Sequence, residues 1–246
     1  MNELVNSIRE RFLVTQDKIA SAAKRSGRSL DAVKLVVVTK SQPVEVAQAA
    51  IEAGAVFLGE NYAEEGVTKI QLLQNYSAVE WHMIGHVQSR KAPLVAGHFN
   101  FMHSLDSLKL AKKLDRFCGE AGRILPVLLE MNVGGEDSKG GWEASDETRW
   151  AELTGEISEI LTMPNLQVRG LMSMPPIGNA AESSRPYFQK VKRLQDFLLK
   201  QLPQAELSEL SMGTSSDYEV AVEEGATYVR VGTAIVGPRS YAAENK

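Results

Sequence analysis

Eight short apolar runs, spaced along the whole chain, constrain its fold more than any other feature. They are residues 35–39, 55–60, 79–85, 99–105, 124–133, 166–174, 207–213 and 227–233. Short runs that are nearly continuously apolar are typical of strands in parallel sheets, which helices cover. We therefore interpret the eight runs as buried β-strands.

Segments with apolar residues at helical spacing lie between these runs. They cover residues 44–53, 62–74, 106–119, 145–161, 181–201 and 216–224, with a looser segment at 87–95 and a short tail after Pro238. Strands that alternate with helices imply a parallel sheet, which is either doubly wound or closed into a barrel. Eight repeats in a chain of 246 residues favour the (β/α)8 barrel, known as the TIM barrel.

An amphipathic helix is expected before the first strand, over residues 3–26. One stripe of this helix carries the apolar residues Leu4, Ile8, Phe12 and Ile19. No linker rich in Pro, Gly or Ser divides the chain. We expect residues 1–246 to form a single barrel domain with an additional N-terminal helix.

Charge and composition exclude several classes of protein. The formal net charge of -4 and the pI of about 5.7 argue against broad binding to nucleic acid or to an anionic membrane. Cys118 is the only cysteine, so an intrachain disulfide is impossible and a reducing compartment is indicated. Glu3 lies early in a helical pattern that is unlike a signal peptide, and no apolar run approaches the roughly eighteen residues of a membrane span. We expect a soluble cytoplasmic protein.

In a barrel of this kind, the residues that follow the strands meet at one mouth. They are Lys40, Glu60, Asn61, His82, His86, Met172, Ser173, Ser211, Gly213, Arg230, Gly232 and Thr233. The set contains one lysine, one arginine, several hydroxyl residues and glycines, but no cluster of acids suited to a metal ion. The longest irregular segment, residues 131–145, follows the fifth strand and is expected to be a mobile flap at this mouth.

Lys40 stands directly after an apolar strand, in the sequence LVVVTKSQP. Its stem could lie on apolar surface while its amine reaches solvent. Alternatively, partial desolvation could make the amine nucleophilic, so that it forms a Schiff base with a carbonyl compound. Lys40 alone does not decide between the two roles.

Two loops rich in glycine and hydroxyl residues follow the last two strands. The first, SMGTSSD at 211–217, contains Gly213 and Thr214, and the second, RVGTAIVG at 230–237, contains Gly232 and Thr233. Barrels often bind phosphate in these loops, through backbone amides and helix N-termini. Either loop alone could be a capped turn, but two such loops facing a lysine suggest a phosphorylated aldehyde as ligand.

Arg230 and His82 refine this hypothesis. Arg230 could form a salt bridge with an acid such as Glu130, or it could face the ring nitrogen of pyridoxal 5'-phosphate (PLP) and keep that nitrogen unprotonated. His82 and His86 lie four residues apart, but in a strand that runs into a loop, with no carboxylate to complete a metal site. We expect His82 to be a hydrogen-bonding wall of the pocket.

Several separated motifs, in a fixed order, resemble the pyridoxal phosphate homeostasis protein family over nearly the whole chain. The motifs are VVVTKSQP, LGENYAEE, WHMIGHVQSRK, GLMSMPP and LSMGTSSDYEVAVEEGATYVRVGTAIVG. The resemblance implies a fold similar to the N-terminal barrel of alanine racemase, with PLP held as an aldimine on Lys40. It further implies a phosphate site and pocket lining made of Ser211, Gly213, Gly232, Thr233, Asn61, His82 and Met172, with Arg230 facing the ring nitrogen.

The chain departs from the pattern of this family at three positions. Thr214 stands where methionine is usual, Arg90 where asparagine is usual and Val236 where phenylalanine is usual. Thr214 lies in the expected phosphate loop and is retained as a candidate ligand. Which hydroxyl contacts the phosphate therefore stays open.

Members of the family are implied to buffer and deliver PLP and to affect vitamin B6 and amino-acid balance, without an established reaction. We therefore expect a monomeric PLP carrier, with PLP-dependent apo-enzymes as candidate recipients. The alternatives are a weak PLP-dependent amino-acid racemase, a lyase that uses Lys40 without a cofactor, and a barrel that binds only a partner protein. Racemisation needs an acid or base on each face of the substrate. Tyr241, in the C-terminal tail, cannot be placed reliably over the cofactor as the second such group.

Overall fold

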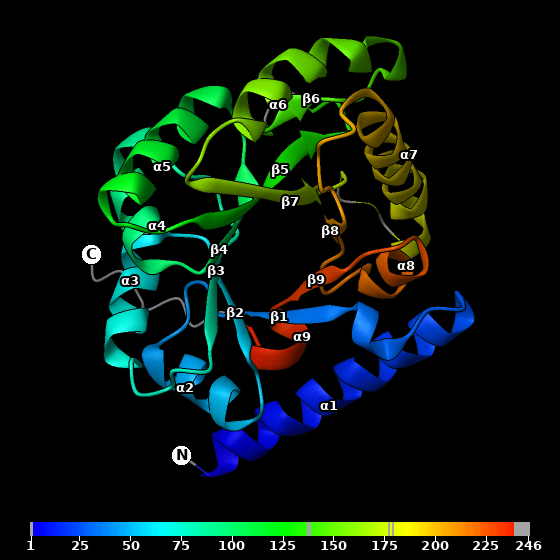
Figure 1. The fold of residues 1–246 in the computed structure, drawn as a ribbon. Coiled ribbons are helices and arrows are strands. Elements are labelled where there is room, and N and C mark those ends of the chain that lie inside the picture. The colour runs from blue at the N-terminus through cyan, green and yellow to red at the C-terminus, as the bar shows by residue number, and fades with distance from the viewer. Residues whose placement is uncertain (1, 137–138, 177, 179, 239–246) are drawn as a thin grey trace, which may run out of the picture.

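A closed parallel barrel forms the centre of the computed structural model, which describes residues 2–136, 139–176, 178 and 180–238. Its strands are β1 (Lys34–Val38), β2 (Phe57–Glu60), β3 (Glu80–Met83), β4 (Phe101–Leu105), β5 (Leu125–Asn132), β7 (Leu166–Met172), β8 (Glu209–Ser211) and β9 (Tyr228–Val231). They pair in the order β4-β3-β2-β1-β9-β8-β7-β5, and β4 also pairs with β5, which closes the ring (Figure 1). The eight predicted strands and the predicted (β/α)8 barrel are confirmed.

Helices surround the barrel (Figure 1). They are α1 (Asn2–Arg25), α2 (Val44–Glu52), α3 (Ala63–Leu72), α4 (Ala92–His98), α5 (Leu108–Glu120), α6 (Thr154–Leu161), α7 (Arg185–Gln201), α8 (Tyr218–Glu223) and α9 (Thr233–Val236). Short 3₁₀ turns form η1 (Leu30–Ala32), η2 (Ser89–Lys91), η3 (Glu147–Leu153) and η4 (Ala181–Ser184). None of the helices in the described part of the chain is long and apolar enough to cross a membrane.

The N-terminal helix α1 is confirmed as an addition to the barrel. It contacts α2, α8 and α9 on the outside of the strands. Ile8, Phe12 and Ile19 of the predicted stripe are buried, and Leu4 packs against the same core. Burying an aliphatic or aromatic side chain contributes about 1.5–3 kcal/mol, so this stripe fixes the helix to the barrel.

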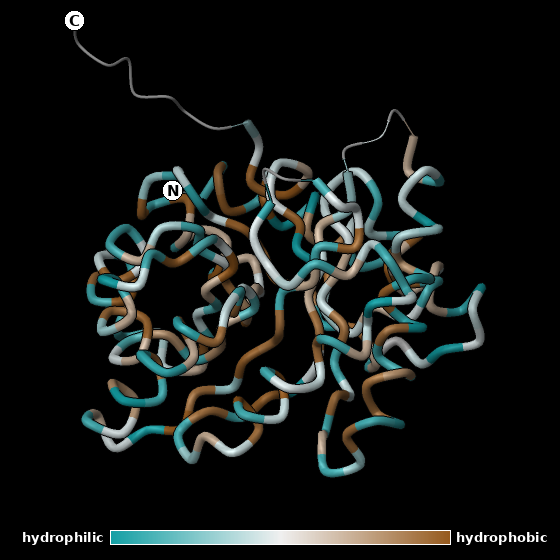
Figure 2. The backbone as a smooth tube through the Cα atoms, turned by 90° about the horizontal axis from the view of Figure 1, so that it is seen from above, coloured by the Kyte–Doolittle hydropathy of each residue, from teal (hydrophilic) through white to brown (hydrophobic). Residues whose placement is uncertain are grey.

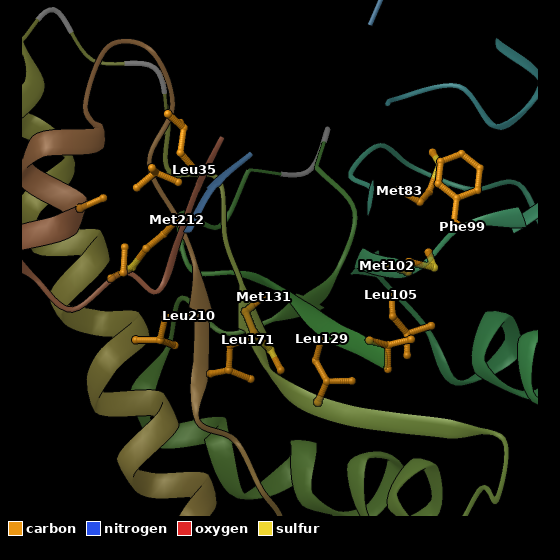
Figure 3. Close-up of a cluster of buried hydrophobic side chains, with 14 of the residues drawn as sticks. Leu35, Met83, Phe99, Met102, Leu105, Leu129, Met131, Leu171, Leu210 and Met212 are labelled. Atoms are coloured by element: carbon orange, nitrogen blue, oxygen red, sulfur yellow. The ribbon is translucent and has the colours of Figure 1, made fainter. Parts of the chain in front are cut away.

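The larger part of the core lies between the strands and the helices. Figure 3 shows the side chains that fill it, among them Leu35, Met102, Leu129, Leu171 and Leu210. Figure 2 shows the apolar runs of the strands in brown within the molecule, whereas the helices alternate between brown and teal. This pattern is expected where one face of each helix covers the sheet.

Inside the barrel the side chains are of a different kind. A small apolar cluster there comprises Val36, Phe101, Leu128, Met172 and Tyr228. Buried polar residues share this interior, among them His82, His103, Ser211 and Arg230. Because neighbouring residues of a strand point to opposite faces, apolar runs that look continuous still place selected polar residues inside the barrel.

The segment 131–145 was expected to be irregular, and that expectation is wrong at Trp142–Glu143. Its first residues belong to β5, and Trp142–Glu143 forms an additional short strand, β6, that pairs in parallel with Met131 and Asn132. Gly141 has φ +96°, and a Cβ there would lie 2.4 Å from the carbonyl oxygen of Glu130. A close backbone approach of this kind is the reason why a short strand forms in a run of turn residues.

A buried ion cluster joins the ends of β1 and β2 to α3. Lys69 Nζ lies 2.8 Å from Glu60 Oε1 and 2.6 Å from Glu65 Oε1, and it donates to the carbonyl oxygen of Thr39 at 2.7 Å. Glu60 Oε1 also accepts from the Thr39 hydroxyl at 2.6 Å, and Glu65 Oε1 accepts from the amide of Ser41 at 2.8 Å. The cluster therefore holds the residues on both sides of Lys40.

We predict that Lys69→Met destabilises the fold by about 3–5 kcal/mol, because it leaves the fully buried Glu60 carboxylate without its cation. Burial raises the pKa of Glu60, and the nearby Lys69 ammonium lowers it and so offsets part of the effect of burial. Urea unfolding measures the change in the free energy of unfolding. The double variant Glu60→Gln/Lys69→Met should recover much of the loss, since no unpaired charge stays buried.

Lys192→Met is the matched control, because Lys192 pairs with Asp196 on an exposed surface. Exposed pairs contribute at most about 1 kcal/mol. A Lys69→Met protein as stable as this control would contradict the role assigned to the buried cluster.

Candidate functional site

A cavity of about 350 Å³ lies at the carboxyl ends of the barrel strands. It is lined by Val38, Lys40, Asn61, Ile84, Gly85, His86, Met174, Thr214, Ser215, Ser216, Arg230, Gly232 and Thr233. The lining combines an amine, a guanidinium, hydroxyl groups and glycine backbone with a few apolar side chains. Its volume is in the range of small-molecule sites, which is about 300–1,000 Å³.

Lys40 is half-buried, and it reaches this cavity from a bend between β1 and α2. Ser41, the next residue, has φ +56°, a conformation that is rare for residues other than glycine. The bond from its amide to Glu65 and the bond from Lys69 to the carbonyl of Thr39 hold this strained bend. The sequence therefore places a lysine at the strand end, and the buried ion cluster determines how its backbone presents it.

The two loops predicted to bind phosphate are close neighbours. The amide of Gly232 donates to the hydroxyl of Ser215 at 3.2 Å, and the amide of Arg230 donates to the carbonyl of Gly213 at 3.0 Å. Gly213 has φ +90°, and a Cβ on it would lie 2.5 Å from the Cβ of Ala221. Only glycine fits here without displacing α8.

Thr214 is a candidate phosphate ligand of the first loop. Its amide donates to Asp217 Oδ1 at 2.7 Å, and its hydroxyl lies 3.1 Å from the same oxygen and 3.3 Å from the Ser216 hydroxyl. Asp217 in turn accepts from the hydroxyl of Ser184 at 2.8 Å. The Thr214 amide and hydroxyl thus serve to shape the loop.

Arg230 lies at the inner wall of the cavity and is almost fully buried. Its NH1 donates to the Ser211 hydroxyl at 2.5 Å, and its NH2 donates to the carbonyl of Ser173 at 3.1 Å. Among the described residues Arg230 forms no salt bridge, since Glu60 pairs with Lys69, and Glu130 and Asp217 act on Arg230 only from a longer distance, raising its pKa. Burial lowers the pKa of Arg230 to about 10, so the side chain is still a cation at neutral pH.

Six of the ten predicted site residues line the cavity together. They are Lys40, Asn61, Thr214, Arg230, Gly232 and Thr233. Gly213 lies next to them in its loop, without lining the cavity. His82, Met172 and Ser211 are enclosed within the barrel, and none of them has more than a trace of exposed surface.

His82 and His86 are separated by the turn that follows β3. His86 lies at the mouth, where its Nδ1 is 2.7 Å from Asp106 Oδ2, whereas His82 contacts His103 in the interior. The sequence reasoning missed His103, which stands inside the apolar run FNFMHSL. A histidine at an inward position of a barrel strand is the signal that could have indicated it. Ile84 and Met174, apolar residues just beyond two strand ends, were missed as well.

Comparison with known proteins finds similar sequences over nearly the whole chain. The sequence model of the family described as alanine racemase, N-terminal domain, matches residues 14–240. A pyridoxal phosphate homeostasis protein of Vibrio alginolyticus is 39% identical over 241 residues, which cover 97% of this chain and 100% of that protein. The protein of the same name from Escherichia coli K12 is 36% identical over 240 residues, which cover 97% of this chain and 99% of that protein.

One solved structure carries a ligand of direct interest. PipY of Synechococcus elongatus PCC7942, described with PLP bound, is 36% identical in sequence, with a TM-score of 0.79. The match covers 94% of this chain and 100% of that chain. Because sequence relatives and fold agree over nearly the full length, the chain belongs to the pyridoxal phosphate homeostasis protein family and carries the alanine racemase N-terminal domain fold.

Proposed function

We propose that this protein binds PLP in the cavity at the mouth of the barrel and acts inside the cell as a PLP carrier. The observation that carries the proposal is the convergence of Lys40, Arg230 and the loop around Gly232 on one cavity. Membership of the family and the PLP-bound relative PipY support the same ligand. PLP supplies an aldehyde that condenses with a primary amine, together with a phosphate and a pyridine ring.

The residues present fit these three parts of the ligand. Lys40 supplies the amine from its strained bend. We assign the phosphate to the loops at 213–216 and 232–233, where glycine backbone and the Thr233, Ser215 and Ser216 side chains border the cavity. Since the Thr214 amide and hydroxyl are bound to Asp217, the hydroxyls of Ser215 and Ser216 are the better candidates for direct contact.

Arg230 is assigned to the pyridine nitrogen. A guanidinium only donates hydrogen bonds, so it can serve a ring nitrogen that accepts, and it opposes protonation of that nitrogen. An unprotonated ring withdraws electrons weakly, which restrains reactions that pass through a carbanion. This assignment agrees better with a carrier than with an efficient racemase.

The remaining candidate residues are assigned supporting roles. Asn61 lines the cavity and is proposed to contact the ligand. His82, Met172 and Ser211 lie in the barrel interior, so we propose that they shape the site from within the barrel. Gly213 contributes through the course of its backbone, which brings the first loop against the second.

In this proposal the protein is one domain and a monomer in the cytoplasm, which holds PLP out of solution and releases it to PLP-dependent apo-enzymes. Neither nucleic acid nor a membrane takes part in the proposed function. The racemase alternative requires a second acid or base opposite Lys40. Tyr241 was the candidate for this role in the sequence, and it lies outside the described residues.

We predict that Lys40→Ala abolishes the covalent attachment of PLP. The wild-type protein should be yellow and, after borohydride reduction, should carry PLP on the peptide that contains Lys40, as measured by mass spectrometry. Lys112→Ala, on the exposed face of α5, is the control and should retain the adduct. An adduct that persists in Lys40→Ala would assign the aldehyde to another amine, and a colourless wild type that does not bind PLP would favour the lyase.

We predict that Gly213→Ala weakens the binding of PLP by about tenfold or more, which corresponds to about 1.4 kcal/mol. The added methyl group would lie 2.5 Å from Ala221 Cβ and 2.9 Å from Tyr218 Cα, so the loop has to shift. Pyridoxal, which lacks the phosphate, should bind both proteins alike in a spectroscopic titration. Gly97→Ala is the control, because a Cβ there meets no atom within 4 Å. If Gly213→Ala weakened the binding of PLP and of pyridoxal equally, the phosphate would not bind at this loop.

We predict that the PLP-loaded protein does not racemise amino acids at ordinary enzyme rates, which are about 1–1,000 per second. The physical reason is the ring-facing guanidinium of Arg230 combined with only one assigned amine, Lys40. A panel of L-amino acids, followed by chiral chromatography, measures the rate, with an alanine racemase assayed in parallel. A turnover rate within that range would contradict the carrier function and favour the racemase.

A further inference from the structure

A line of buried polar side chains crosses the inside of the barrel, where apolar packing is usual. Arg230 NH1 lies 2.5 Å from Ser211 Oγ, Ser211 Oγ lies 2.8 Å from His103 Nδ1, and His103 Nε2 lies 2.8 Å from His82 Nδ1. These residues come from β9, β8, β4 and β3 and are 0 to 4% exposed. The line therefore leads from the cavity into the core of the barrel.

The Arg230 guanidinium and the buried Ser211 hydroxyl together determine the direction of the hydrogen bonds in this line. A guanidinium can only donate, so the Ser211 oxygen accepts from it. Among the described residues the other partner of this buried hydroxyl is His103 Nδ1, so its hydrogen is satisfied by donating to that nitrogen. A neutral imidazole that accepts at Nδ1 carries its hydrogen on Nε2. His103 Nε2 then donates to His82 Nδ1, and His82 in turn carries its hydrogen on Nε2. The guanidinium and the Ser211 hydroxyl thus specify the tautomers of two histidines.

The far end of the line meets charged groups at the amino ends of the strands. His82 Nε2 lies 3.6 Å from Glu80 Oε2, which is too long for a good hydrogen bond but close enough for attraction. Lys34 Nζ donates to the Tyr228 hydroxyl at 3.0 Å and lies 3.1 Å from Glu209 Oε1. The polar line therefore has a cation near each end, and carboxylates lie near both, since Glu130 and Asp217 raise the pKa of Arg230 against the effect of its burial.

Aromatic rings hold the two imidazoles in place. His82 stacks on Phe101 with a centroid distance of 5.3 Å and an interplanar angle of 8°. Phe57 meets His82 edge-on at 5.5 Å, and Tyr228 meets His103 edge-on at 5.1 Å. Rings packed in this way cannot rotate to exchange donor and acceptor without disturbing the core.

Both imidazoles are neutral in this arrangement. A second proton on His82 would place its Nδ1–H against the Nε2–H of His103. A second proton on His103 would leave the buried Ser211 hydroxyl hydrogen without its acceptor. Burial lowers the pKa of His82 and that of His103. The charged or titratable groups around them are Arg230, Tyr228, Lys34, Glu80 and Glu209.

We propose that Ser211, His103 and His82 form a directed hydrogen-bond chain that holds the Arg230 guanidinium in the position from which it faces the ligand. They are positioning residues for Arg230, and the inference rests on the proposed function in so far as the ligand is PLP. The chain holds protons in place and does not transfer them, because Arg230 stays protonated. Its effect on the ligand is to fix the direction of the donor that faces the ring.

The first experiment tests the chain without any ligand. Nitrogen-15 NMR of the histidine side chains, assigned with His→Gln variants, reports which ring nitrogen carries the hydrogen. We expect His82 and His103 to be neutral Nε2–H tautomers over roughly pH 5 to 8, the range in which histidine ordinarily titrates. An Nδ1–H tautomer at His103, or a charged imidazole at pH 7, would overturn the proposal.

The second experiment compares two substitutions at one position. His103→Gln can accept from Ser211 through Oε1 and donate to His82 through Nε2, whereas His103→Leu can do neither. For His103→Leu we expect PLP affinity to fall by about tenfold and the pH profile of the bound chromophore to shift, since the Ser211 hydroxyl that accepts from the guanidinium loses the partner that orients it. His103→Gln should restore both toward wild type, and His98→Leu on α4 should leave both unchanged.

Equal effects of Gln and Leu at position 103, or a wild-type spectrum in His103→Leu, would overturn the positioning role. If His103→Leu does not fold, Ser211→Ala, which removes the acceptor of Arg230, is measured in its place with the same expectation. If the wild-type protein binds no PLP, the proposed function fails, and the NMR tautomers still decide whether the chain exists.

Discussion

The arrangement at the barrel mouth depends on one buried ammonium group, that of Lys69. It binds the carboxylates of Glu60 and Glu65 and the carbonyl of Thr39, so three separate elements meet on a single cation. A buried charge is tolerated only when such partners surround it. Glu60, Glu65 and Thr39 are therefore held in fixed positions around the ammonium group of Lys69. Lys40 lies on the bend that results, between two of the residues that the cluster binds.

A second constraint acts from inside the barrel. Arg230 stands between the cavity and the interior, and its cation imposes an order on Ser211, His103 and His82. The two constraints act on neighbouring parts of the same cavity wall, because β1, which precedes Lys40, pairs with β9, which carries Arg230. One presents an amine on a strained turn, and the other presents a guanidinium that can only donate. An aldehyde with a ring nitrogen that accepts a hydrogen bond is complementary to this pair, and the proposed PLP site follows from that complementarity.

The sequence predicted the architecture well because period and composition are local properties. Apolar runs and helical spacing located eight strands and the helices between them to within a few residues. The error at residues 131–145 has a physical reason. Trp142–Glu143 pairs with β5 because Gly141 permits a close backbone approach, and this depends on what lies opposite the segment rather than on its own polarity.

For the site, the sequence by itself determined which chemical groups the strands deliver to the carboxyl end of the barrel: an amine at 40, a guanidinium at 230 and two glycine loops after the last strands. The tertiary structure alone decided which of them reach the cavity. His82 and Ser211 were expected at the mouth, but they point into the barrel and join His103, which lies far from both in sequence. The reason is that a strand position determines only which side of the sheet a residue faces. Its depth along the barrel axis and its hydrogen-bond partners are decided by strands that meet only when the barrel closes.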